Sequence, residues 1–79
     1  MKPFLLNTME EIQFELTEEY IELIKLLKVL TLAQTGGHAK MIVDNGEVMR
    51  NGEREFRKRA KLVKGDVIVI ADQISVEIV

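Results

Sequence analysis

The spacing between apolar residues changes along the chain, and this change constrains the fold more than any other feature. Near the N-terminus, Ile12, Phe14 and Leu16 alternate with polar residues, which predicts a short strand. Between residues 20 and 30 the apolar spacing becomes three and four, as on one face of a helix. We therefore expect a helix over residues 18–28, capped by the Thr17 hydroxyl. Its apolar stripe consists of Tyr20, Leu23, Ile24, Leu27 and Leu30.

A second helix is expected after the first. Thr35 precedes the pair Gly36-Gly37 and can cap a helix over residues 36–45. Asn45-Gly46 is a natural end for it, because glycine tolerates the left-handed conformation that follows many helices.

The remaining residues have the pattern of paired strands. Asn51-Gly52, inside residues 48–54, is a strong signal for a hairpin. Residues 67–70 and 74–78 are rich in β-branched side chains, and the turn Asp72-Gln73 separates them. The order of elements predicts an α+β fold, in which two packed helices lie on a small antiparallel sheet with a short N-terminal strand.

Composition narrows the class of protein. A chain of 79 residues makes one small domain, and without cysteine it has no disulfide and no thiolate metal site. No apolar run approaches the ~20 residues of a membrane span, so we expect a cytoplasmic protein that does not contact membranes. The net charge is −2, yet residues 36–64 contain eight Lys and Arg against four acidic residues. Such a local excess can bind a polyanion even when the whole chain is acidic.

The segment Gly36-Gly37-His38-Ala39-Lys40 is the most distinctive motif. Two glycines at a helix start allow a phosphate or another backbone to approach closely, and the free amides there favour an anion. On the helical wheel Lys40 lies between the two glycines, so that its ammonium and the glycines share one surface. The alternative interpretation is a plain turn followed by a helix cap.

The run Arg57-Lys58-Arg59 is the second distinctive motif. Three consecutive cations outside any apolar period are typical of a segment that binds a phosphate backbone. The alternative is a solvated loop whose charge is softened by Glu53 and Glu55. Phe56, next to the run, either stacks on a base or anchors the loop.

Residues suited to catalysis form no recognisable group. His38 is the only histidine, and no cysteine accompanies it to complete a zinc site. Ser75 lies in no motif that would pair it with a base. We therefore expect no catalytic residue, no metal site and no cofactor, and the chain is not expected to be an enzyme.

Six short segments, taken in order, resemble a known family. They extend over about two thirds of the chain. They are Leu26-Leu27-Lys28, Thr35-Gly36-Gly37-His38-Ala39-Lys40, Gly46-Glu47-Val48, Asn51-Gly52-Glu53, Arg57-Lys58-Arg59-Ala60-Lys61-Leu62 and Gly65-Asp66-Val67-Ile68. This pattern is similar to the RNA-binding domain first known from the fourth protein of the small ribosomal subunit, the alpha-L motif. The glycine pair followed by Ala and Lys is most like the small stand-alone bacterial proteins of the YbcJ type.

The resemblance implies RNA contacts from the end of the first helix, the start of the second and the basic run. Carried over by position, the expected RNA-binding residues are Lys28, Thr35, Gly36, Gly37, Lys40, Arg57, Lys58, Arg59 and Lys61. The chain departs from the stand-alone relatives at Ala60, where they usually have glycine after the basic pair. The RNA-binding domain is expected over residues 17–79, preceded by an acidic lead-in with a short strand over residues 1–16.

The resulting hypothesis is a monomeric RNA-binding protein associated with the ribosome or its assembly. Its partner is expected to be structured ribosomal RNA, or else transfer RNA, contacted through the phosphate backbone; DNA is not expected. Shape and phosphates are the expected targets because side chains do not reach the bases in the deep groove of an RNA helix. The alternative hypothesis is a protein-interaction adaptor that binds no nucleic acid.

Overall fold

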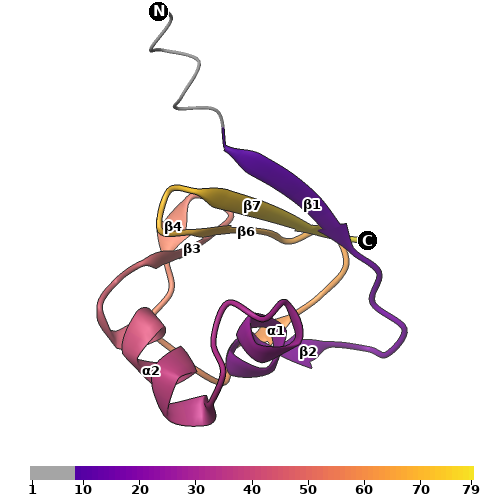
Figure 1. The fold of residues 1–79 in the computed structure, drawn as a ribbon. Helices are drawn as coiled ribbons and strands as arrows, with labels where there is room; N and C mark the ends of the chain where they lie inside the picture. Colours follow the sequence, from indigo (N-terminus) through magenta and orange to yellow (C-terminus); the bar gives the residue numbers. More distant parts are fainter. Residues whose placement is uncertain (1–8) are drawn as a thin grey trace, which may run out of the picture.

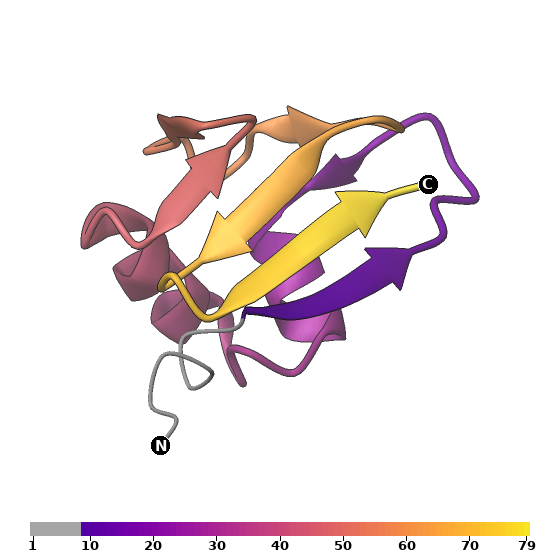
Figure 2. The same cartoon turned by 90° about the horizontal axis from the view of Figure 1, so that it is seen from above.

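A five-stranded sheet with the order β1-β7-β6-β3-β4 forms the centre of the structure, a computed structural model that describes residues 9–79. In chain order the elements are β1 (Glu10–Phe14), β2 (Ile21–Glu22), α1 (Leu23–Val29), α2 (Gly36–Asp44), β3 (Val48–Arg50), β4 (Glu53–Arg54), β5 (Lys61–Leu62), β6 (Val67–Ile70) and β7 (Ile74–Ile78). The helices lie below the five-stranded sheet in Figure 1 and behind it in Figure 2, so they cover one of its faces. Strands β2 and β5 form a separate pair beside α1.

The expected α+β fold, with helices packed on a small sheet and a strand near the N-terminus, is confirmed. Strands β7, β6, β3 and β4 are antiparallel neighbours, whereas β1 pairs with β7 in parallel, which makes the whole sheet mixed. The register places Ile12 opposite Val76. Residues 10–14 of the expected lead-in therefore belong to the sheet, while residues 1–8 lie outside the described part of the chain.

The first helix begins later than expected. It starts at Leu23 rather than at residue 18, and Glu22, without a side-chain hydrogen bond, occupies the N-cap position expected for Thr17. The difference arises because Ile21 and Glu22 are extended and pair with β5, which buries the Ile21 side chain. A strand pairing with residues about forty positions away thus overrides the local preference for a longer helix.

Carbonyl groups from a distant segment replace the missing cap of α1. The Leu23 amide donates to the Ala60 carbonyl, and the Ile24 amide donates to the Lys58 carbonyl, each at 3.0 Å. The first amides of a helix have no acceptor within the helix, so these bonds satisfy two of them. The segment that carries Arg57-Lys58-Arg59 is consequently fixed against the start of α1.

The helix cap, the hairpin turn and the last two strands that the sequence predicts after residue 34 are confirmed. Thr35 caps α2, and its hydroxyl accepts a hydrogen bond from the His38 amide at 3.0 Å. The hairpin turn between β3 and β4 has Asn51 at φ 53° and Gly52 at φ 88°, the left-handed pair that a two-residue hairpin favours. Strands β6 and β7 occupy the ranges that their β-branched residues predict.

Apolar side chains from both helices and the sheet meet in one core. The largest fully buried side chains are Leu23, Leu26, Leu27, Val43, Val48, Leu62, Ile68, Val76 and Ile78. Tyr20, which the spacing places in the same stripe, is instead 38% exposed because it precedes β2 and lies outside the helix. In residues 9–79, no helix has both the length and the apolar character needed to cross a membrane.

The core predicts the effect of truncating Leu27. Leu27, on α1, is completely buried in the core, so Leu27→Ala should lower the free energy of unfolding by ~2–5 kcal/mol. Val29→Ala, on the same helix at a half-exposed position, is the control and should change it by less than about 1 kcal/mol. Urea unfolding monitored by circular dichroism measures both; equal losses in the two variants would contradict this packing.

Candidate nucleic-acid interface

Residues 55–60, which connect β4 to β5 and are called the basic loop here, contact both helices. At one end Phe56 packs against Gly46, just beyond the end of α2: a Cβ placed on Gly46 would lie 3.5 Å from the Phe56 ring. At the other end the Lys58 and Ala60 carbonyls accept from the first amides of α1. The loop therefore connects the end of α2 with the start of α1 along the surface, and its backbone is held at both places.

The Asp66 carboxylate links the β3–β4 hairpin, which precedes this loop, to the residues after β5, which follow it. It is buried and accepts two bonds from the Arg50 guanidinium, at 2.8 and 3.1 Å, one from the Asn51 side chain at 2.9 Å and one from the Val63 amide at 2.9 Å. Burial raises the pKa of Asp66, but the hydrogen bonds from Val63, Asn51 and Arg50 outweigh it, so its pKa lies below the ordinary value. Arg50 also donates to the Lys61 carbonyl at 2.9 Å. The hairpin is thereby joined to β5 and to the turn before β6.

Within the basic loop, Glu55 is a second carboxylate that accepts several hydrogen bonds. Its buried carboxylate accepts from the Arg57 side chain at 2.9 and 3.0 Å and from the Arg57 amide at 3.0 Å, and Arg50 lies 3.7 Å away. The side-chain hydrogen bond from Arg57 is the largest influence, and together with the neighbouring charges it lowers the pKa of Glu55 from 4.5 to about 2. In the sequence, Glu55 is recognisable only as a charge that offsets part of the basic run. Its burial gives it a structural role that the local sequence does not reveal.

The cations expected to bind RNA at this loop differ in the contacts that they make with other side chains of the protein. Arg57 bonds to Glu55, although its side chain remains 74% exposed. Arg59 lies 3.9 Å from the Glu22 carboxylate, a loose contact at an exposed position. Among residues 9–79, no acidic group lies within ion-pair distance of Lys58. Lys61, on β5, lies 4.9 Å from the centre of the Tyr20 ring.

The expected site residues on the helices form a second group. Lys40 pairs with Asp44 at 2.7 Å on the exposed surface of α2, a contact worth only ~0.3–0.5 kcal/mol. Around Gly36, and around Gly37 apart from the Thr35 hydroxyl at 3.9 Å, the described residues leave open space for a side chain. Nothing in the fold therefore requires glycine at these two positions. The open space leaves room for an external group at the start of α2.

The expected site residues on the helices and those of the basic loop lie at different ends of α1 and α2. Lys28 is in the last turn of α1 and Thr35 caps α2, whereas the basic loop contacts the first turn of α1 and the residue after the C-cap of α2. An α-helix rises 1.5 Å per residue, so the nine residues of α2 extend over roughly 13 Å. Arg57, Lys58 and Arg59 belong to one loop that contacts Gly46 and the start of α1, whereas Gly36 and Gly37 lie at the opposite end of α2 from Gly46.

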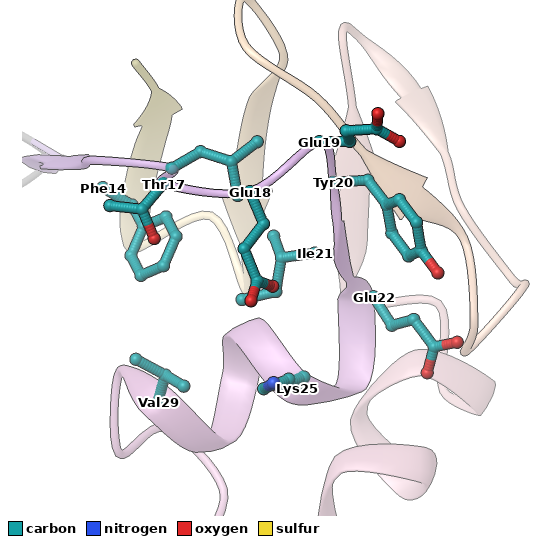
Figure 3. A pocket seen from close by; sticks show the side chains of 10 residues that line it. Phe14, Thr17, Glu18, Glu19, Tyr20, Ile21, Glu22, Lys25 and Val29 are labelled. Carbon is teal, nitrogen blue, oxygen red and sulfur yellow. The ribbon is translucent and has the colours of Figure 1, made fainter.

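A hollow of about 660 Å³ lies between the β1–β2 connection and α1, and its lining residue Glu22 is the one that Arg59 approaches at 3.9 Å. Figure 3 shows the Glu18 side chain pointing toward Lys25 of α1, and the apolar side chains of Phe14, Ile21 and Val29 line the same hollow. Glu19 and Glu22 also line it, so its rim repels phosphate. The described residues contain no group of three His, Cys, Asp or Glu placed to hold a metal ion.

Comparison with known proteins gives consistent matches. Residues 14–79 match the S4 domain family. YbcJ of Escherichia coli (strain K12), whose provisional name describes an RNA-binding protein, is 37% identical over 60 residues that cover 76% of this chain and 84% of YbcJ. RlbA of Bacillus subtilis (strain 168), provisionally named a ribosome maturation protein, is 40% identical over 52 residues that cover 66% of this chain and 73% of RlbA.

The Glu55–Arg57 contact predicts a stability difference that depends on pH. Because folding lowers the pKa of Glu55, its carboxylate stabilises the folded state above pH 4.5, and this contribution disappears as the pH falls toward 2. Glu55→Gln should therefore cost about 1–3 kcal/mol at pH 7, and the difference from the unmodified chain should shrink below pH 4.5. Urea unfolding at several pH values measures it.

The control for that experiment is Glu53→Gln. Glu53 is an exposed carboxylate in the same hairpin, so its substitution changes the net charge equally without removing the contact to Arg57. It should leave stability within ~0.5 kcal/mol of the unmodified chain at every pH. Equal stabilities of the two variants at pH 7 would contradict the role assigned to Glu55.

Proposed function

Because this chain belongs to the S4 domain family, we propose that it is an RNA-binding protein that holds structured RNA by its phosphate backbone. The family match and the provisional name of the E. coli relative support binding to RNA and give no indication of catalysis. The proposed contacts come from the basic loop and the adjoining Lys61 of β5, from the last turn of α1, and from the start of α2 together with Lys40. Together they comprise Lys28, Thr35, Gly36, Gly37, Lys40, Arg57, Lys58, Arg59 and Lys61.

One observation carries the proposal: the basic loop presents exposed cations on a backbone that is already fixed. Its carbonyls bond to α1, and its Glu55 carboxylate is held by Arg57. A loop that is ordered before binding loses little conformational entropy when RNA arrives. Lys58 and Arg59 are therefore available for phosphates at little cost, and Lys40 can exchange its exposed partner Asp44 for a phosphate.

Two groups of contacts separated by the length of α2 suit an extended polyanion. An RNA strand that passes both the start of α2 and the basic loop would meet cations at two places. Phosphate contacts of this kind fix position and affinity but carry no sequence information, so the shape of the RNA would determine the choice. Structured ribosomal RNA is the favoured partner, with transfer RNA second, because the B. subtilis relative is provisionally named a ribosome maturation protein.

Within the chain we assign the RNA contacts to residues 17–79. Residues 10–14 of the acidic lead-in form β1 of the sheet, and we assign no phosphate contact to residues 9–16. On this assignment the acidic hollow and β1 face solvent or other partners when RNA is bound. The protein would act as a monomeric accessory of the ribosome or of its assembly, in the cytoplasm.

Salt dependence of binding tests this proposal. Each phosphate contact releases counterions, so removing one should reduce the slope of log affinity against log salt by about one unit. The double variant Lys58→Ala, Arg59→Ala should therefore bind a structured ribosomal RNA fragment more weakly, with a slope about two units shallower. Fluorescence anisotropy across a salt series measures both quantities.

Lys64→Ala is the matched control. Lys64 is an exposed lysine in the turn after β5, where the neighbouring Gly65 amide donates to the Ile78 carbonyl at 2.8 Å, and it lies outside the proposed contacts. It should change affinity and slope far less than the double variant does. If Lys64→Ala has the same effect as the double variant, binding is diffuse and the proposed surface is wrong. If the unmodified chain binds no RNA, the adaptor hypothesis takes its place.

A further inference from the structure

We propose that Phe56 is a stacking platform for an unpaired base of the bound RNA, an inference that rests on the proposed function. Phe56 lies in the basic loop, immediately before Arg57-Lys58-Arg59, and its side chain is 59% exposed. A single exposed apolar residue needs no explanation by itself. Here the ring also has a fixed support and charged neighbours, and together these features indicate a binding role.

The support comes from Gly46. The Phe56 ring packs against this glycine, where an added Cβ would lie 3.5 Å from the ring, and Gly46 has φ +74°. The contact covers only part of the ring, since most of it remains exposed. The backbone on both sides of Phe56 is also held, because the Glu55 amide donates to the Val48 carbonyl at 2.9 Å and the Arg57 amide donates to the Glu55 carboxylate at 3.0 Å. The exposed part of the ring is thus presented in a defined place.

The charged neighbours are suited to the phosphates next to a stacked base. The Arg54 guanidinium donates to the carbonyl of Gly46, the residue that the ring contacts, and Arg57 follows Phe56 directly in the chain with a side chain that is 74% exposed. An aromatic ring between cations can hold a base by stacking while the cations hold its backbone. Tyr20 is a weaker candidate because Lys61 already lies over its ring at 4.9 Å and the side chain is only 38% exposed.

This arrangement specifies the class of RNA. In a continuous helix every base is stacked on its neighbours, and a side chain outside the helix cannot reach a base face. A ring such as Phe56 can stack only on a base that has left the helix, as in a bulge or loop. The cations of the basic loop would bind either kind of RNA. Phe56 would therefore add affinity only for RNA in which an unpaired nucleotide lies next to a helix.

The experiment compares two RNAs whose helices share the same flanking sequence and whose lengths differ by a single nucleotide. One contains a single-nucleotide bulge, and the other is fully paired with one more base pair replacing the lost length. Phe56→Ala should weaken binding of the bulged RNA about 5- to 100-fold, the loss seen when a stacking aromatic is removed, and should leave binding of the paired RNA unchanged. Phe56→Tyr should retain the preference, whereas Phe56→Leu, similar in apolar character but without a π-face, should lose it.

Met41→Ala is the matched control. Met41 is 61% exposed and lies with His38 and Asn45 on the side of α2 that faces the β6–β7 turn, so it tests the loss of an exposed apolar side chain elsewhere. It should affect neither RNA. Melting curves of all variants show whether each remains folded, and Phe56→Leu preserves an apolar contact to Gly46 if the alanine variant is unstable.

The possible outcomes separate this inference from the proposed function. If Phe56→Leu weakens binding of both RNAs equally, Phe56 only anchors the loop and the stacking proposal is overturned. The same conclusion follows if Phe56→Ala and Phe56→Leu keep the full preference for the bulged RNA, or if the unmodified chain has no preference. Binding of both RNAs by the unmodified chain upholds the proposed function in each of these cases, whereas failure to bind either RNA overturns both.

Discussion

The contact between Arg50 and the buried carboxylate of Asp66 is the interaction on which the rest of the surface depends. It joins the β3–β4 hairpin to the turn before β6, and the same guanidinium donates to the Lys61 carbonyl and lies 3.7 Å from Glu55. The basic loop leaves the hairpin at Glu55 and enters β5 at Lys61, so both of its ends are positioned by Arg50. A half-buried arginine thus fixes the path of a segment whose cationic side chains are exposed. Breaking one partner of such a contact is costly, because it leaves a buried charge without compensation.

Local patterns predicted the parts of the fold that depend on local interactions. The cap at Thr35, the Asn51-Gly52 turn and the strands β6 and β7 all follow from a few adjacent residues, and the structure confirms them. The family suggested by six short motifs is likewise confirmed. The predicted start of α1 was wrong because Ile21 pairs with β5, a strand about forty residues later. No pattern among the residues near Ile21 indicates that pairing.

Part of the candidate site follows from residues that are adjacent in the sequence, and the rest depends on how the chain packs. Arg57, Lys58 and Arg59 form a cluster because they are adjacent in the sequence. The ion pair between Arg57 and Glu55 depends on the burial of the Glu55 carboxylate, and that burial arises only when the hairpin packs. The separation of this cluster from Gly36 follows from the path of the loop, which runs to the start of α1 rather than to the start of α2. The RNA contacts themselves remain predictions. Their physical basis is the combination of a fixed backbone with exposed cations, on a chain whose net charge is −2.

The central claim is that RNA binds at the basic loop and the start of α2 and leaves the acidic side of the molecule free. A titration of ¹⁵N-labelled protein with a structured ribosomal RNA fragment, followed by amide NMR spectra, tests it most directly. The account predicts that the largest shifts occur at residues 55–61 and 35–40, while the amides of β1, at the opposite edge of the sheet from β4, change little. Shifts concentrated at β1 or around the hollow, with the basic loop unaffected, would contradict the account.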